Sequence, residues 1–136
     1  MVLYDGECGF CMWLLASLLR LDRAERLRPI ALQRPDADEL LADLAPAERI
    51  VSWHLISAAG ERFSAGDAIP PLLGLLPGGR PAALAFVRTP GLAERGYRWV
   101  AAHRSQLSEL VPSRAKQRAG ERVRRRERAL QTRPTA

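Results

Sequence analysis

The chain is poor in cysteine and histidine, which argues against several kinds of protein. Its 136 residues include two cysteines, three positions apart, and two histidines, His54 and His103. A small secreted domain held together by disulfides would need more cysteines, spread along the chain. A structural zinc site needs four ligands, and the two histidines lie far apart without finger-like spacing. We therefore expect no metal and no cofactor.

Long hydrophobic runs are also missing. The longest one, residues 12–19, is interrupted by Ser17 and is much shorter than the roughly 20 residues that span a bilayer. The N-terminus begins directly with the apolar Val2 and Leu3, without the basic start of a secretory signal. The sequence therefore predicts a protein of the reducing cytoplasm.

The surplus of basic charge belongs to the C-terminal end. The net charge is +6, but residues 113–136 hold nine basic and two acidic side chains, and the rest of the chain is nearly neutral. A nucleic-acid-binding role for the whole protein is therefore not indicated. The basic segment has no apolar face and no aromatic residue to stack on bases. We predict a domain over 1–111 and a disordered or loosely helical basic tail over 112–136, which makes weak contact with anions and binds no specific nucleic acid.

The order of the expected elements indicates the fold class. Hydrophobic residues make up 47% of the chain, enough for one core. Strands are predicted over 2–4, 27–32, 50–57 and 61–64, and helices over 9–21, 36–44, 67–76, 82–88 and 92–110. Pro29 cannot donate to a ladder, so its strand belongs at an edge, and the first strand is interior. This order predicts an α/β, thioredoxin-like fold with about four strands in a mixed sheet, flanked by helices and followed by extra C-terminal helices.

Local signals predict where helices begin and which faces they bury. Asp36 and Asp67 are expected N-caps, and Pro46 is expected to end the second helix. In the first helix a buried stripe is predicted from the spacing of Cys11, Leu14, Leu15 and Leu18. A second buried stripe is predicted in the last helix, at Ala93, Tyr97, Val100, Ala101 and Leu107.

Cys8 and Cys11 fall between the first strand and the first helix. A sulfur at a helix N-terminus faces unpaired backbone N–H groups and the positive end of the helix dipole. Cysteines in such places have pKa values of about 3.5 to 7.5, against roughly 8.5 when free. We expect Cys8 to be the attacking thiolate and Cys11 the resolving thiol. The loop is too short for the disulfide to stabilise the fold much, and metal binding and inert packing remain the alternatives.

Asp5 has two compatible interpretations. Its carboxylate can form the turn, accepting hydrogen bonds from the backbone around Gly6 and Glu7. It can also act in catalysis, taking the proton from Cys11 as that thiol attacks a mixed disulfide. The second role would require Asp5 to lie partly buried near Cys11.

Three segments resemble a known family. Residues 4–11, Tyr-Asp-Gly-Glu-Cys-Gly-Phe-Cys, resemble the signature of the DCC family of predicted thiol–disulfide oxidoreductases, named after an Asp-Cys-Cys motif. Gly60 followed by 65–68, and the helix 97–104, are similar to two further family motifs. The resemblance covers roughly residues 1–111 and implies a thioredoxin-like fold and disulfide exchange. It assigns supporting loop roles to Tyr4, Gly6, Gly9 and Phe10, and motif positions that we interpret as structural to Gly66, Asp67, Ala68, Tyr97 and Arg104.

The chain departs from the expected pattern at a few places. Thioredoxin relatives usually carry a cis-proline before the third core strand, where this chain has Val51 or Ser52. Met12 and Trp13 stand where the family often has basic residues. Trp13 and Arg20 are expected to be covered by the C-terminal helices, and a partner surface is the alternative. Arg104 is expected to form an ion pair and Tyr97 to lie in the core. Each histidine is interpreted as an ordinary surface or satisfied core residue.

The leading hypothesis is an enzyme that exchanges disulfides, mainly as a reductase. Its partners would be a disulfide-containing protein or small-thiol substrate and an electron donor. A redox sensor without turnover is one alternative. A binding module whose basic tail contacts phosphates or anionic lipid is another.

Overall fold

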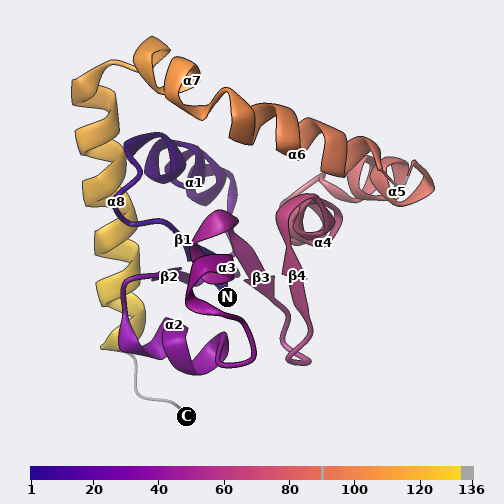
Figure 1. Cartoon of the computed structure of the whole chain (residues 1–136), viewed down its shortest axis with the longest axis horizontal. Coiled ribbons are helices and arrows are strands. Elements are labelled where there is room, and N and C mark those ends of the chain that lie inside the picture. The colour runs from indigo at the N-terminus through magenta and orange to yellow at the C-terminus, as the bar shows by residue number, and fades with distance from the viewer. Residues whose placement is uncertain (90, 133–136) are drawn as a thin grey trace.

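A four-stranded mixed sheet organises the protein (Figure 1). The computed structural model describes residues 1–89 and 91–132. The strands are β1 (Val2–Tyr4), β2 (Pro29–Ala31), β3 (His54–Ile56) and β4 (Arg62–Ser64). Their order is β2-β1-β3-β4, with β1 and β2 parallel and the other two pairs antiparallel. The predicted α/β, thioredoxin-like fold is confirmed, with the Pro29 strand at an edge and β1 inside.

Helices cover both faces of this sheet. They are α1 (Gly9–Leu21), α2 (Pro35–Leu40), α3 (Pro46–Val51), η1 (Ala65–Ala68), α4 (Ile69–Leu75), α5 (Arg80–Arg88), α6 (Leu92–Ala102), α7 (Arg104–Leu110) and α8 (Ser113–Gln131). Because strand side chains alternate between faces, Val2 and Tyr4 join the core beneath α1, α4 and α8, whereas Leu3 packs with α2. None of the helices within residues 1–89 and 91–132 is long and apolar enough to cross a membrane.

Proline accounts for two errors in the predicted boundaries. Pro46 was expected to end a helix, but it opens α3, which occupies the first part of the predicted strand 50–57. Pro35 likewise opens α2, so that Arg34 rather than Asp36 is the N-cap, and the helix ends at Leu40. Proline suits the first turn of a helix because its fixed φ is helical. It lacks a backbone N–H, but the N–H groups of the first turn have no acceptor within the helix anyway.

Two further predictions concern the segments before α4 and before β3. Asp67 is exposed within η1 and does not cap α4, whose N-cap is Ala68. Val51 ends α3 and Ser52 is its C-cap, so Trp53 is the residue directly before β3. No peptide bond among the described residues is cis.

The largest correction concerns the predicted basic tail. Ser113–Gln131 forms the 19-residue helix α8, which runs beside α1 (Figure 1). Ala119 and Gly120 are buried, and Val123 is fully buried in the same core as Val2. The prediction of a solvated tail without an apolar face is therefore wrong for this segment, because small residues at helical spacing form a narrow buried stripe among arginines. Residues 133–136 lie outside the described part.

The buried face of α1 differs from the predicted stripe because α8 packs against it. Met12, Leu15 and Ala16 are buried, whereas Leu14 is 43% exposed. A Cβ built on Gly120 of α8 would lie 3.4 Å from the sulfur of Met12, so the two helices approach closely. Trp13 packs at the margin of the main core, and Arg20 is exposed. The prediction that the C-terminal helices cover Arg20 is wrong.

The predicted helix over 92–110 is two helices, broken at His103. Of the predicted stripe, Ala93 is buried and Ala101 is exposed, while Tyr97, Val100 and Leu107 are half-buried. The stripe prediction is therefore right for one end of α6 and wrong at Ala101. The break at His103 rotates the two helices relative to each other, so a single helical period does not describe both.

Candidate active site

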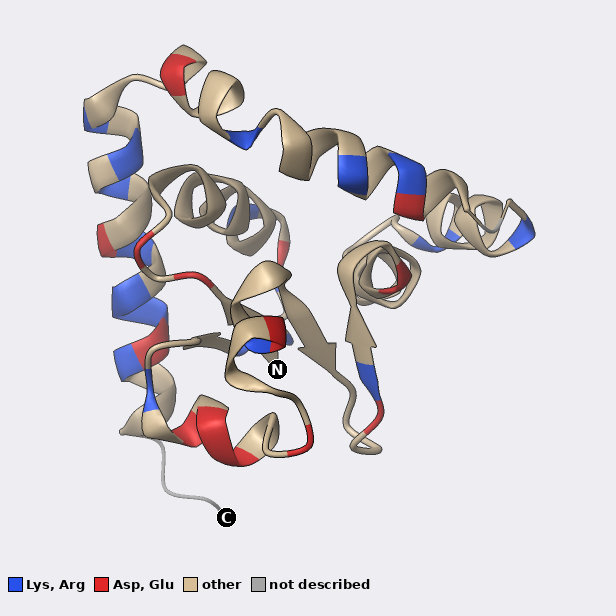
Figure 2. Cartoon of the chain, viewed as in Figure 1, with Lys and Arg blue, Asp and Glu red and all other residues tan. Residues whose placement is uncertain are grey.

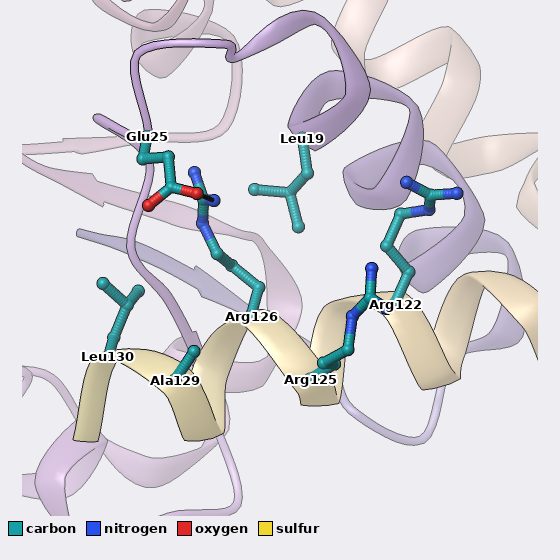
Figure 3. A pocket seen from close by; sticks show the side chains of 7 residues that line it. All are labelled: Leu19, Glu25, Arg122, Arg125, Arg126, Ala129 and Leu130. Atoms are coloured by element: carbon teal, nitrogen blue, oxygen red, sulfur yellow. Dashed lines mark ion pairs between the residues drawn. The ribbon is translucent and has the colours of Figure 1, made fainter. Parts of the chain in front are cut away.

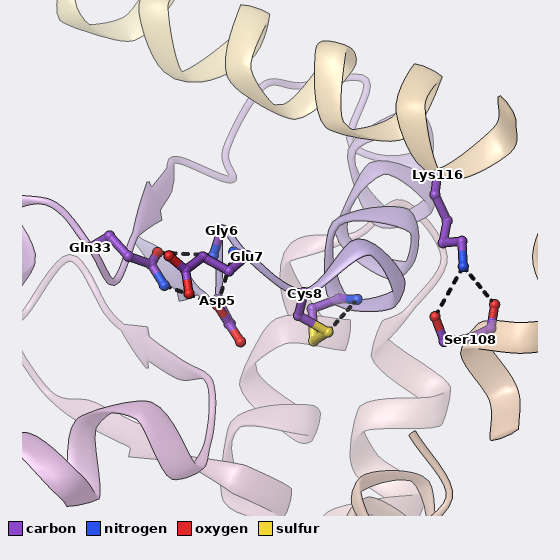
Figure 4. The surroundings of a disulfide bond; sticks show 8 residues. Asp5, Gly6, Glu7, Cys8, Gln33, Ser108 and Lys116 are labelled. Atoms are coloured by element: carbon purple, nitrogen blue, oxygen red, sulfur yellow. Dashed lines mark hydrogen bonds between the residues drawn. A yellow bond between two sulfur atoms is a disulfide. The ribbon is translucent and has the colours of Figure 1, made fainter. Parts of the chain in front are cut away.

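The two cysteines form a disulfide at the start of α1 (Figure 4). Cys8 is the N-cap residue, with extended backbone, and its sulfur accepts a hydrogen bond from the backbone N–H of Cys11 at 3.2 Å. Both cysteines are half-buried, and their Cα atoms are 5.2 Å apart. The predicted position of the pair at the strand–helix junction is confirmed. In the reduced protein the same N–H group and the helix dipole would stabilise a Cys8 thiolate.

Asp5 shapes the loop that leads to the cysteines. Its Oδ1 accepts hydrogen bonds from the backbone N–H of Glu7 at 3.0 Å and from Nε2 of Gln33 at 2.9 Å. The Gln33 side-chain oxygen in turn accepts from the backbone N–H of Gly6 at 3.0 Å. A Cβ at Gly6 would lie 2.9 Å from this oxygen, so glycine leaves room for the contact. The turn-forming role of Asp5 is confirmed, and its role as a proton acceptor stays a prediction.

Gln33 was not identified from the sequence. It follows β2, and only the parallel pairing of β1 and β2 brings it beside the loop. Gly6 and Gln33 are 27 positions apart, and no local motif links them. Once the edge position of β2 is known, a polar residue just beyond its end is the signal that could have found Gln33.

The two residues between the cysteines are held by packing. A Cβ built on Gly9 would lie 3.2 Å from Cδ of Lys116 in α8. Phe10 is buried and stacks on Trp13, with ring centroids 6.0 Å apart. The first turn of α1 is therefore fixed on one side by α8 and on another by an aromatic pair.

Glu127 of α8 reaches the strand that precedes the active-site loop. Its Oε2 accepts a hydrogen bond from the Tyr4 hydroxyl at 3.3 Å, and its Oε1 accepts from the backbone N–H of Ala31 at 3.1 Å. Arg34 adds an ion pair at 3.6 Å. Burial, together with the charge of Glu127, raises the pKa of the Tyr4 hydroxyl. Glu127 was not predicted as a contact residue, because residues 112–136 were expected to form a solvated tail.

Of the other motif residues, Gly66 connects η1 to α6. The Gly66 N–H donates to Oε2 of Glu94 at 3.0 Å, and a Cβ at Gly66 would collide with the Glu94 backbone. Ala68 is fully buried. Tyr97 is half-buried, and burial raises the pKa of its hydroxyl. Arg104 is exposed and makes none of the ion pairs found in the described ranges, so its predicted pairing is not seen.

His54 is a satisfied core histidine, as predicted. It is 1% exposed, and its Nε2–H donates to the carbonyl of Arg49 at 3.0 Å. Its Nδ1 must then accept from the Ser64 hydroxyl, at 2.7 Å. Burial lowers the pKa of His54. His103 stacks on Trp99 at 4.5 Å between centroids, and the part of the chain that the structure describes holds no cluster of three metal-ligating side chains.

A basic hollow of about 320 Å³ lies at the far end of α1 (Figure 3). It is lined by Leu19, Glu25, Arg122, Arg125, Arg126, Ala129 and Leu130. Arg126 pairs with Glu25 at 2.7 Å and with the buried Asp22 at 3.2 Å. Basic residues follow one another along α8 (Figure 2). Since Leu19 is near the C-terminal end of α1 and Cys8 caps its start, the hollow is separate from the cysteines.

A disulfide-forming cysteine pair at the first strand–helix junction of this sheet defines the class of a thioredoxin-like thiol–disulfide oxidoreductase. The DCC1-like thiol-disulfide oxidoreductase family matches residues 2–110, and the chain belongs to this family. Neither the curated proteins nor the solved structures gave a match. The family match ends before α8, so the contacts of Lys116 and Glu127 come from a helix beyond the matched residues.

Proposed function

We propose that the protein exchanges disulfides with Cys8 as the attacking thiolate and Cys11 as the resolving thiol. The observation that carries this proposal is the position of the Cys8 sulfur at the start of α1, where it accepts the N–H of Cys11. An anion at this point is favoured by a hydrogen bond and by the helix dipole, and thiolate is the nucleophilic form of cysteine. Cys11 is held within bonding distance of Cys8, as the disulfide requires.

The proposed reaction proceeds through a mixed disulfide. The Cys8 thiolate attacks one sulfur of a substrate disulfide, forming a Cys8–substrate bond and releasing the other substrate sulfur as thiolate. Cys11 then loses its proton and attacks the Cys8 sulfur. This step closes the Cys8–Cys11 disulfide, releases the second substrate thiolate and leaves the substrate reduced by two electrons. A dithiol reductant restores the two thiols by the same exchange in the opposite sense.

We propose that Asp5 accepts the proton that Cys11 loses in the second step. Both hydrogen bonds described for the Asp5 carboxylate fall on Oδ1, so we assign Oδ2 as the oxygen that takes the proton. Asp5 is half-buried in the loop directly before Cys8, and its carboxylate is held there by the Glu7 N–H and Gln33. Asp5→Asn should slow closure of the disulfide and spare the first attack.

The substrate class and direction follow from the chemistry of the dithiol. We propose a disulfide-containing protein or a small disulfide as substrate, and the reductase direction in a cytoplasmic, reducing setting. Dithiols of this type span reduction potentials of roughly −270 to −120 mV, so the potential of the Cys8–Cys11 pair decides the direction. Titration against glutathione or dithiothreitol buffers measures it.

Trapping tests the proposal directly. Cys11→Ser should accumulate mixed disulfides through Cys8, visible on non-reducing gels and by mass spectrometry, because the second attack is blocked. Cys8→Ser, the matched control, should accumulate none. If neither variant traps a disulfide substrate, and Cys8 titrates near 8.5 or above like a free thiol, the proposal is wrong.

We also propose weak anion contact by α8, centred on Arg122 and Arg125. Both line the basic hollow and are exposed, whereas the charge of Arg126 is offset by Asp22 and Glu25. Such contact would fall steeply with salt, since exposed charges are screened. It is a separate property and plays no part in the exchange reaction.

A further inference from the structure

Lys116 is the one lysine of the sequence, and its side chain lies over Gly9, one of the two residues between the cysteines. A Cβ built on Gly9 would be 3.2 Å from Cδ and 3.7 Å from Cβ of Lys116. The aliphatic part of the lysine therefore covers the backbone of Gly9 in the first turn of α1. Glycine allows this close approach, because a Cβ at position 9 would displace the lysine stem by a few tenths of an ångström.

The far end of Lys116 is also held in place. Its Nζ donates to the backbone carbonyl of Ser108 at 2.9 Å and to the Ser108 hydroxyl at 3.2 Å (Figure 4). Lys116 is half-buried, so its ammonium is fixed between α7 and α8 and is less hydrated than a free surface lysine. A charge in this position is screened less by salt than an exposed one.

The contact with Gly9 limits how far the ammonium can lie from the Cys8 sulfur. Nζ is two bonds beyond Cδ, and Cys8 adjoins Gly9, so covalent geometry limits the separation of ammonium and sulfur to a value on the order of 10 Å. At that distance, near a protein surface, a positive charge still favours the charged form of a thiol. Because the start of α1 carries no acidic side chain in its first turn, the helix itself does not oppose this effect.

The other charged groups near the dithiol come from three elements. The loop after β1 supplies Asp5 and Glu7, which disfavour a thiolate. The Asp5 carboxylate accepts hydrogen bonds from the Glu7 N–H and from Gln33, and Glu7 is exposed. On the helices packed against α1, charged side chains near Lys116 are Arg104 and Glu109 of α7 and Arg114 and Arg118 of α8, all exposed. Lys116 differs from these in being anchored at both ends and in contact with the turn between the cysteines.

We propose that Lys116 is a positioning residue of the dithiol, whose stem fixes the Gly9 turn and whose ammonium favours Cys8 in its thiolate form. This inference rests on the proposed exchange reaction and deepens it. It places part of the active site on α8, beyond the residues that match the family. The motif residues alone then do not set the reactivity of the pair.

The test uses the full chain with Lys116→Met, which keeps an aliphatic stem over Gly9 and removes the charge. Arg128→Met, an exposed position near the C-terminal end of α8, is the matched control. The pKa of Cys8 is measured by the pH dependence of its alkylation with iodoacetamide in the reduced protein. The Cys8–Cys11 reduction potential is measured against glutathione buffers.

Lys116→Met should raise the pKa of Cys8 by about half a unit to one unit, which lowers the thiolate fraction below that pKa about three- to tenfold. The reduction potential should become more negative, because the reduced form loses stabilisation. Lys116→Arg should restore both values, and Arg128→Met should change neither. Near-native unfolding temperatures for all variants exclude a general loss of structure.

Unchanged pKa and potential in Lys116→Met would overturn the proposal. A shift that Lys116→Arg does not reverse would assign the effect to packing and would overturn it as well. Either result leaves the exchange reaction intact if Cys11→Ser still traps substrate, so the two proposals fail separately.

Discussion

Replacing Glu127 with alanine should destabilise the fold strongly, although the residue lies in a segment that is otherwise rich in exposed arginine. Glu127 is 9% exposed and accepts from the Tyr4 hydroxyl and the Ala31 N–H. Truncation leaves both donors without this acceptor, and a buried unpaired donor costs about 1–3 kcal/mol. The ion pair with Arg34 adds little because the arginine is partly exposed. We expect a total loss of about 3 kcal/mol.

The measurement is urea unfolding at pH 7, with Glu121→Ala as control. Glu121 lies on the same helix and is exposed, so its loss should change the free energy of unfolding by about 0.5 kcal/mol or less. Glu127→Gln keeps one acceptor oxygen and should cost about 1 kcal/mol. If Glu127→Ala were no more harmful than Glu121→Ala, the contact between α8 and the edge of the sheet would not be a stabilising one.

The same contact has a signature at high pH. Burial, and then Glu127, raise the pKa of Tyr4 above the unfolded value of 10.0. A raised folded pKa means that the folded state holds its proton where the unfolded state has lost it. The share of the folding stability that comes from protonated Tyr4 is therefore fully present below pH 10 and decreases as the pH rises above 10. Tyr4→Phe should flatten this decline, and the unfolding measurement at pH 7 is unaffected by it.

Three further predictions concern other parts of the molecule. Gly66→Ala should lower the free energy of unfolding in urea by about 2 kcal/mol or more, since the new Cβ would collide with the backbone of Glu94. Gly96→Ala, in open space within α6, should raise it by about 0.5–1 kcal/mol. Equal effects of the two substitutions would contradict the close approach at Gly66. Because burial lowers the pKa of His54, the stability that neutral His54 contributes should be fully present above pH 6.5 and should decrease as the pH falls below it. A His54→Gln variant that loses stability just as steeply on acidification would refute this assignment. Wild-type protein should bind pyrophosphate weakly at low salt, as followed by calorimetry, and the Arg122→Ala, Arg125→Ala double variant should not; binding retained in that variant would remove the anion site.

The local features of the active site could be predicted because they depend on neighbours in sequence. Asp5, Gly6 and Cys8 lie within one turn, and the preferences of each residue type point to the same strand–turn–helix geometry. The edge position of β2 followed from Pro29 alone, since a residue without an N–H is excluded from the middle of a sheet. Gln33 could not be found in this way, because its contact with Gly6 exists only after β1 and β2 have paired.

The helix α8 was missed for a different physical reason. Its buried stripe consists of Ala119, Gly120 and Val123, which contribute little hydrophobicity to any sequence average. Burial here depends on close approach rather than on large side chains, as the contact between Gly120 and Met12 shows. A helix that packs through small residues needs a complementary surface on its partner. For α8 that surface belongs to other elements, so the sequence of α8 alone does not show it.

The position of α8 has a consequence for the edge of the sheet. β2 would present an unpaired row of backbone groups along its outer side, and exposed edges of this kind invite pairing with other chains. Glu127 accepts the N–H of Ala31 on that side, and α8 packs on β2 and α1 together. Removing α8 would therefore expose the edge, the core around Val123 and the Gly9 turn at once. Since the same helix covers an edge strand and the dithiol turn, stability and cysteine reactivity are coupled in this chain, and only point substitutions can separate them.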